Sequence, residues 1–282
     1  MSEAYIGFHV SLGKSIDSVF DTAQSMGCTA LQMFTRNPRG WKFKDLNESQ
    51  VKSFREKREK SGFRFVVDHM PYLPNLASPV KQVMKKSRET LIAEVERCEK
   101  LGIDYLVLHL GSHMGKGIDV GMQNVAEACN LALKRRGRTT ILLENSAGQK
   151  NSVGSRFEEL SRLTGMIKSG RIGICLDTCH LFASGYDISS RRSVEKTMMY
   201  FEKIVGIDML KAVHLNDSRG KLGSNLDRHE NIGKGMIGLQ GIRAFVRYDK
   251  IIRERPIILE TPYKDFDTVR EDLNTLRSIL PN

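Results

Sequence analysis

Histidine and carboxylate residues recur at the ends of apolar, strand-like runs along this chain. The runs FVVDH, YLVLH and ILLE end at His69, His109 and Glu144. Later runs add six more candidates, which are Asp177, His180, His214, Asp227, His229 and Glu260. Histidine nitrogens and carboxylate oxygens are the usual ligands of zinc and related divalent ions. The pattern therefore predicts one polynuclear metal site that is assembled from many strands.

The size of this ligand set indicates more than one ion. A tetrahedral zinc takes about four ligands, and a catalytic zinc leaves one position open. Nine ligands overfill one ion. Two ions are compatible with the set, and three fit better because each then keeps room for water or phosphate. The set holds nitrogen and oxygen atoms but no thiolate, which favours Zn²⁺ and also permits Mn²⁺ or Fe²⁺.

Strands and helices alternate from one end of the chain to the other. Eight strands are predicted, at Tyr5–Val10, Ala30–Phe34, Phe65–His69, Tyr105–Leu110, Thr140–Glu144, Ile172–Asp177, Lys211–Leu215 and Pro256–Glu260. Helices are predicted between them; Asn47 and Gln50 form a capping-box-like start of one, and Gly102 ends the next. Near-continuous apolar strands that alternate with helices predict the α/β class, as a single (β/α)8 TIM barrel over residues 1–282.

Closing the strands into a barrel brings the candidate ligands together. The C-terminal ends of parallel barrel strands face one mouth, where active sites lie. Asp227 and His229 are two residues apart, so in an extended segment both side chains point the same way. His180 follows Asp177 by three residues, where the strand turns away. An open doubly wound sheet, the structural alternative, sets its strand ends in a line and would not converge so many ligands.

The composition fits a single soluble enzyme with an excess of positive charge, although many basic proteins bind no nucleic acid. The 282 residues include 44 Lys and Arg against 33 Asp and Glu, a formal net charge of +11. This excess favours nucleic acid as a partner. No apolar run approaches the roughly 18 residues of a membrane span, and no signal peptide is predicted. The five cysteines are odd in number and lack a CxxC pair, so we expect free thiols and a non-secreted protein in the cytoplasm, or wherever the genome is held. We also expect a monomer.

Longer motifs, spread in order over essentially the whole chain, are more specific than the ligand types. They are FTRNPRGW, YLPNLASP, LHLGSH, LLENSAGQ, CLDTCHLFASGYD, HLNDS, GSNLDRHENIGKGMIG and ILETP. With these motifs the chain resembles the endonuclease IV family, the zinc-dependent apurinic/apyrimidinic endonucleases. The resemblance implies an (α/β)8 barrel that acts on double-stranded DNA containing abasic sites. It implies hydrolysis 5′ to the abasic site, giving a 3′-hydroxyl and a 5′-deoxyribose phosphate, with 3′-end trimming in many members.

The resemblance also divides the ligands among three zinc ions. The groups are His69, His109 and Glu144; Asp177, His214 and Glu260; and His180, Asp227 and His229. Glu144 would bridge the first two ions, which makes it the expected catalytic carboxylate. Close metal ions lower the pKa of a shared water and neutralise charge on a phosphate in the transition state.

Two loops are predicted to contact DNA. The first follows the second strand and supplies Arg36, Asn37 and Arg39 for phosphates. The second follows the third strand and places Tyr72 and Leu73 at the mouth, where such a pair can wedge into a base stack. The resemblance places Tyr72 in the family's DNA-penetrating loop.

Two other classes of protein remain open at this point. A sugar isomerase of the xylose isomerase type also uses a barrel with carboxylate and histidine ligands, but generally needs fewer histidines and a catalytic lysine at a strand end. No predicted strand here ends in lysine. A non-catalytic DNA-binding module would not need nine ligands. His9 and His113 stay outside the ligand set. His9 is expected behind the metal ligands and His113 near a phosphate, with a structural role as the alternative for each.

Overall fold

Eight parallel strands close into one barrel in the computed structural model, which describes residues 4–251 and 255–281. Their order around the barrel is β1-β10-β7-β6-β5-β4-β3-β2. The strands are β1 (Tyr5–Val10), β2 (Ala30–Met33), β3 (Phe65–His69), β4 (Tyr105–Leu108), β5 (Thr140–Glu144), β6 (Ile172–Asp177), β7 (Leu210–His214) and β10 (Pro256–Leu259). The predicted (β/α)8 barrel is confirmed.

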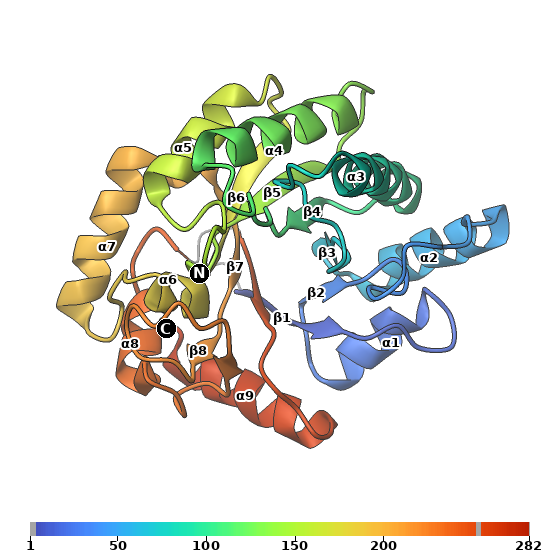
Figure 1. Ribbon diagram of the computed structural model, residues 1–282. Helices are drawn as coiled ribbons and strands as arrows, with labels where there is room; N and C mark the ends of the chain where they lie inside the picture. Colours follow the sequence, from blue (N-terminus) through green and yellow to red (C-terminus); the bar gives the residue numbers. More distant parts are fainter. Residues whose placement is uncertain (1–3, 252–254, 282) are drawn as a thin grey trace.

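Helices follow the strands and surround the barrel (Figure 1). They are α1 (Ser18–Ser25), α2 (Glu48–Ser61), α3 (Lys81–Leu101), α4 (Ile118–Ala132), α5 (Phe157–Met166), α6 (Thr178–Ala183), α7 (Arg191–Ile204), the 3-10 turn η1 (Ile207–Met209), α8 (Gly238–Val246) and α9 (Phe266–Ile279). The predicted capping box opens α2, where Asn47 and Gln50 exchange hydrogen bonds. Gly102 ends α3 with a φ of 76°, a left-handed conformation that favours glycine.

Several strands end earlier than the apolar runs predicted. The strands predicted to end at Phe34, Leu110 and Glu260 end one or two residues earlier in the structure. Strand β7 begins and ends one residue before its predicted bounds. At β10 the cause is visible, because the backbone N–H of Glu260 donates to the Asn216 side chain at 2.8 Å. His109 and Glu260 therefore lie just past their strands, where the chain turns into the mouth.

The strands are buried on both faces, which explains why their sequences are apolar almost throughout. Side chains on the outer face join the large core that the helices cover, including Val66, Leu106 and Leu143. Alternate positions form a separate layer inside the barrel, made of Val67, Val107, Leu142, Cys175 and Ala212. Because the side-chain period of a strand is two residues, the positions two residues later also face inward, one layer closer to the mouth.

A short antiparallel pair, β8 (Asp217–Ser218) and β9 (His229–Glu230), lies after β7. The buried Asp217 carboxylate accepts backbone N–H groups of Gly235, Ile237 and Gly238. A Cβ atom at position 235 would lie 2.5 Å from Asp217 Oδ1, so glycine is required there. These contacts hold the segment that carries His229. In the described ranges, no helix is long and apolar enough to cross a membrane.

Candidate metal centre

The inward positions at the mouth carry the candidate ligands. His69, His109 and Glu144 follow the inner apolar residues Val67, Val107 and Leu142 by two positions each. Asp177 and His214 follow Cys175 and Ala212 in the same way. The strand period therefore places five ligands in one layer, above an apolar plug that keeps water out from below.

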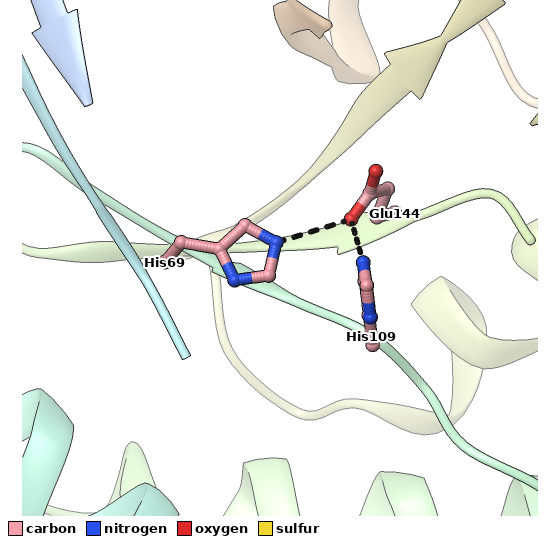
Figure 2. A group of neighbouring side chains, drawn as sticks. All are labelled: His69, His109 and Glu144. Atoms are coloured by element: carbon pink, nitrogen blue, oxygen red, sulfur yellow. Dashed lines mark ion pairs between the residues drawn. The ribbon is translucent and has the colours of Figure 1, made fainter. Parts of the chain in front are cut away.

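His69, His109 and Glu144 form the first group (Figure 2). Both imidazoles point their Nε2 atoms at the same carboxylate oxygen, Glu144 Oε2, at 3.5 Å from His69 and 3.0 Å from His109. His69 and Glu144 are buried, whereas the His109 side chain is 42% exposed. This group therefore opens to the solvent on the side of His109.

Glu144 is also part of the second group, with Asp177, His214 and Glu260. His214 Nδ1 lies 3.0 Å from Glu144 Oε1 and 3.3 Å from Glu260 Oε2. Asp177 and His214 are directly opposite each other in the β6–β7 register. The two oxygens of Glu144 thus face different groups, which is the arrangement that a bridging carboxylate needs.

His180, Asp227 and His229 form the third group, from the loops at the mouth. Asp177 caps α6 by accepting the His180 backbone N–H at 2.7 Å, which explains the spacing of three residues between them. Asp227 Oδ1 lies 3.1 Å from His180 Nε2 and 3.7 Å from His229 Nε2. The structure thus brings all nine predicted ligands into three adjoining groups.

Several buried ligand atoms in these groups make no hydrogen bond. They are Glu144 Oε2, His180 Nε2 and His229 Nε2, although each has an opposite type of ligand atom within 3.5 Å. A buried polar atom without a partner costs free energy. These nitrogen and oxygen atoms point toward a common centre but do not form hydrogen bonds with one another. Such an arrangement suits a cation bound between them. The donor set, with only nitrogen and oxygen, fits Zn²⁺, Mn²⁺ or Fe²⁺.

The other ring nitrogen has a defined partner in three of the ligand histidines. Nδ1 of His69, His180 and His229 lies 2.8 Å, 2.9 Å and 3.1 Å from the backbone carbonyls of residues 70, 145 and 260. A carbonyl can only accept, so each Nδ1 carries a proton and Nε2 is the nitrogen that remains to bind an ion. This arrangement orients imidazoles for metal ligation.

Cys179 lies near Asp177 and His229 and is the one cysteine of the described residues that groups with the ligands. Burial raises the pKa of its thiol to about 12. Without an ion the thiol therefore keeps its proton, and it donates a hydrogen bond to the Arg228 carbonyl at 3.5 Å. Only a bound metal ion would convert it to the thiolate that ligates.

The ligands shift one another's protonation. Burial acts to raise the pKa of Glu144, but the charges of His109 and His214 hold it well below its usual range. Burial acts to lower the pKa of His180, yet Asp177 and the hydrogen bond with Asp227 raise it well above its usual range. Without an ion, the ionised carboxylate of Glu144 therefore lies near the protonated imidazole of His180, and a cation would displace a proton from that imidazole.

Metal affinity is therefore expected to rise steeply with pH. The raised pKa values of His180 and His214, both set by neighbouring groups against the effect of burial, keep these imidazoles protonated above the pH at which free histidine loses its proton. For each proton that the metal must displace, the apparent metal affinity rises about tenfold per pH unit, until the pH passes the raised pKa of that imidazole. Competition with a chelator between about pH 6 and about pH 8 measures this, and a constant affinity would contradict it.

Three buried amides connect the ligands, and the sequence analysis missed them. Asn145 accepts the Asp177 backbone N–H at 2.7 Å, and Asn216 donates to Asp177 Oδ2 at 2.7 Å. Gln32 contacts both His214 and Glu260. The signal was present for Gln32, because ALQMF places a polar residue at an inward position of an apolar strand.

The two histidines left outside the ligand set support the structure. His9 Nδ1 lies 3.1 Å from Glu260 Oε1, behind the second group. His113 Nδ1 accepts the backbone N–H of Gly117 at 3.1 Å and shapes the loop before α4. Each therefore positions other residues and neither completes a ligand group.

The two predicted DNA loops touch each other at the mouth. The backbone N–H of Tyr72 donates to the Pro38 carbonyl at 3.2 Å. Tyr72 is 57% exposed and Leu73 is 40% exposed, so both apolar side chains project from the surface. The Tyr72 ring packs edge-on against Phe34, with 5.2 Å between centroids, and lies 6.0 Å from the His69 ring. The pair thus stands beside the first ligand group.

Arg36 is placed differently from its prediction as a phosphate contact. Its guanidinium is buried, forms an ion pair with Glu94 of α3 and lies 4.1 Å from the centroid of the Phe43 ring. A buried cation that is already paired does not present its charge to a phosphate, so the assignment of Arg36 is revised. Asn37 and Arg39 are both exposed, and the Arg39 backbone N–H donates to Asn37 Oδ1 at 3.0 Å.

Two hollows flank the ligands. One, of about 310 Å³, is lined by aromatic residues including Phe34 and Tyr263 together with His69, His109 and Glu260. The other, of about 380 Å³, reaches from His109 and Asp227 to polar residues such as Ser146 and Lys150. His109, His180 and Asp227 line both hollows, so the two hollows meet at the ligands.

Known proteins resemble this chain in sequence and in fold. The family model described as "Xylose isomerase-like TIM barrel" matches residues 20–279. A protein named "Probable endonuclease 4" from Nitrosopumilus maritimus (strain SCM1) is 48% identical over 275 residues, which cover 96% of this chain and 97% of that protein. The chain belongs to the endonuclease IV family. Within the broader group of xylose isomerase-like barrels, this family contains nucleases.

Further relatives agree with this assignment to the endonuclease IV family. "Probable endonuclease 4" from Methanoculleus marisnigri is 45% identical over 97% of both chains. A crystal structure of endonuclease IV from Thermus thermophilus superposes with a TM-score of 0.87 at 34% identity, covering 98% of each chain. A D-tagatose 3-epimerase-like protein has a TM-score of 0.71 at 20% identity, and that likeness shows the fold alone. The resemblance drawn from the motifs is confirmed.

Proposed function

We propose that this protein is a DNA-repair endonuclease that hydrolyses the phosphodiester 5′ to an abasic site. The products would be a 3′-hydroxyl and a 5′-deoxyribose phosphate, and the same site would trim blocked 3′ ends. The observation that carries the proposal is the convergence of nine ligands into three adjoining groups at a barrel mouth. Membership of the endonuclease IV family and the net charge of +11 support DNA as the substrate.

The three groups would hold three zinc ions, with Mn²⁺ or Fe²⁺ as alternatives. The first ion would take His69, His109 and Glu144, and the others the second and third groups. Bound ions would supply a hydroxide nucleophile near neutral pH and neutralise charge on the phosphoryl oxygens. Glu144 would hold the first two ions together, because its two oxygens face different groups.

The protein itself would orient the substrate and exclude water. The backbone carbonyls behind three of the histidines keep the ligand nitrogens aimed at the mouth. Tyr72 and Leu73 would enter the base stack at the lesion. Asn37 and Arg39 would contact phosphates beside it. Arg36 is left out of this proposal because its charge is paired with Glu94.

An incision assay on a duplex with one abasic site tests the proposed function directly. The purified protein should nick the damaged strand, lose this activity in a chelator and recover it with Zn²⁺. End analysis should show a 3′-hydroxyl and a 5′-deoxyribose phosphate. A protein that interconverts ketoses and aldoses but leaves the duplex intact would support the sugar isomerase instead. DNA binding without incision, with full metal content, would support a binding module.

We further propose that the protein acts as a monomer in the cytoplasm, or wherever the genome is held. A closed barrel with one complete ligand set needs no second copy to finish the site. Size-exclusion chromatography with light scattering should give a mass near the 31.9 kDa of one chain. A dimer at the concentrations used for incision would contradict the monomer.

Replacing Arg39 by alanine is expected to weaken DNA binding and to flatten its salt dependence. Each phosphate contact by a cation contributes a slope of about −0.9 to the logarithm of affinity against the logarithm of salt concentration. Loss of Arg39 should therefore reduce the slope by about one contact. Arg191→Ala is a matched control, because Arg191 is an exposed arginine of α7 that pairs with Glu195. Equal slopes for the wild type and Arg39→Ala would remove Arg39 from the proposed interface.

A further inference from the structure

Gln32 is a fully buried polar side chain inside the barrel, at an inward position of β2. Burying an amide costs free energy unless its donors and acceptor are all satisfied. The neighbouring inward residue on the same strand, Ala30, is apolar and packs into the lower part of the barrel. A glutamine in this layer therefore needs partners among the ligands around it.

The partners of Gln32 are two metal ligands and the histidine behind them. Its amide nitrogen donates to Glu260 Oε1 at 2.6 Å and lies 2.9 Å from His9 Nδ1. Its Oε1 lies 2.7 Å from His214 Nε2. An ionised carboxylate can only accept, so the amide orientation is fixed by Glu260, and Oε1 must be the atom that faces His214.

This orientation decides which nitrogen of His214 can bind a metal ion. Oε1 can only accept, so His214 Nε2 donates to it and keeps its proton, and Nδ1 is the nitrogen that an ion can bind after displacing a proton from it. Nδ1 is the atom that lies 3.0 Å from Glu144 and 3.3 Å from Glu260. His214 is thus reversed relative to His69, His180 and His229, whose protonated nitrogen is Nδ1.

The reversed histidine is held by a side chain, whereas the other three are held by backbone carbonyls. A backbone carbonyl is present whatever the residue, but the acceptor for His214 is lost with Gln32. The same amide also restrains Glu260, which follows the end of β10, and β10 lies on the opposite side of β1 from β2. One side chain therefore sets both the tautomer of His214 and the position of Glu260.

We propose that Gln32 is a positioning residue of the second metal group, which fixes His214 as an Nδ1 ligand and aligns Glu260 with it. This inference rests on the proposed metal-dependent function and adds to it a residue that does not touch the metal or the DNA. Hydrogen-bonding partners of metal ligands commonly contribute about 10- to 100-fold to metal affinity or activity. Gln32 should contribute within that range.

The variant Gln32→Met tests the proposal, because methionine has a similar length and no amide. Titration of the metal-free protein with Co²⁺ should show one of the bound equivalents weakened by about 10- to 100-fold, with a changed absorption spectrum. In the zinc-loaded enzyme kcat should fall, while KM for an abasic duplex stays near the wild-type value. Gln123→Met, in an exposed position on α4, is the matched control and should change neither quantity.

A second measurement does not depend on any substitution of Gln32. Nitrogen-15 NMR of histidine-labelled, zinc-loaded wild-type protein should show one ligand imidazole protonated at Nε2, which the variant His214→Asn identifies by its loss. If Gln32→Met does not fold, this spectrum alone decides. Protonation of His214 at Nδ1, or Co²⁺ binding by Gln32→Met with wild-type affinity and spectrum, would overturn the proposal. Absence of incision by the wild type would instead reject the proposed function and leave both metal measurements valid.

Discussion

Glu144→Gln is expected to reduce incision of an abasic duplex by at least about 10³-fold, the scale of losing a key group that stabilises the transition state. The substitution keeps the size of the side chain and removes one negative charge. That charge lies between His69 and His109 on one side and His214 on the other. A neutral amide would no longer hold two cations close together, so metal content should fall as well.

The measurement combines metal analysis with the incision assay on the same preparation. Glu158→Gln is a matched control, because Glu158 is an exposed carboxylate of α5. A circular dichroism spectrum like that of the wild type would show that the barrel still forms. Near-normal incision by Glu144→Gln, with unchanged metal content, would rule out a carboxylate shared between two ions.

Tyr72→Ala is expected to weaken binding to an abasic duplex by about 10- to 100-fold, which corresponds to the roughly 1–3 kcal/mol of one base–aromatic stack. Binding to an undamaged duplex should change much less. A base that is already missing makes the helix easier to open, and the ring could occupy the gap. The ring is suited to this role because it is 57% exposed while Phe34 supports its inner edge.

Paired binding curves at one salt concentration measure this difference. Tyr72→Phe keeps the ring and should retain most of the affinity. Tyr200→Ala removes a partly exposed tyrosine of α7 and is the matched control. An equal loss of affinity for both duplexes in Tyr72→Ala would make Tyr72 a general contact, and selectivity would then have to come from the hollows beside the ligands.

The charge distribution also connects metal loading to substrate binding. Four carboxylates lie at the mouth, namely Glu144, Asp177, Asp227 and Glu260. A phosphodiester would be repelled by this cluster unless cations neutralise it. The positive net charge of the chain therefore cannot by itself bring a phosphate into the site. Bound ions would both assemble the ligands and make the mouth attractive to DNA.

Much of this architecture is determined by local sequence. Alternation of apolar runs with helical segments predicts all eight barrel strands, because a strand buried on both faces must be apolar throughout. The two-residue period then puts residues such as His69 and Glu144 in the same layer, whatever the helices outside do. The same local rule explains why Asp177 and His180 meet, since one caps the helix that carries the other.

The sequence by itself thus determined the barrel and the identity of the nine candidate ligands, while the tertiary structure decided their partners. Arg36 lies in a loop motif suited to DNA, but Glu94, from a helix 58 residues later in the chain, pairs with it in the interior. Gln32 meets His214 and Glu260 only because β2 and β10 lie on either side of β1. Strand period and helix capping act between near neighbours in the chain, whereas the pairing of buried charges and amides joins residues far apart in the sequence, and only the folded barrel brings those residues together.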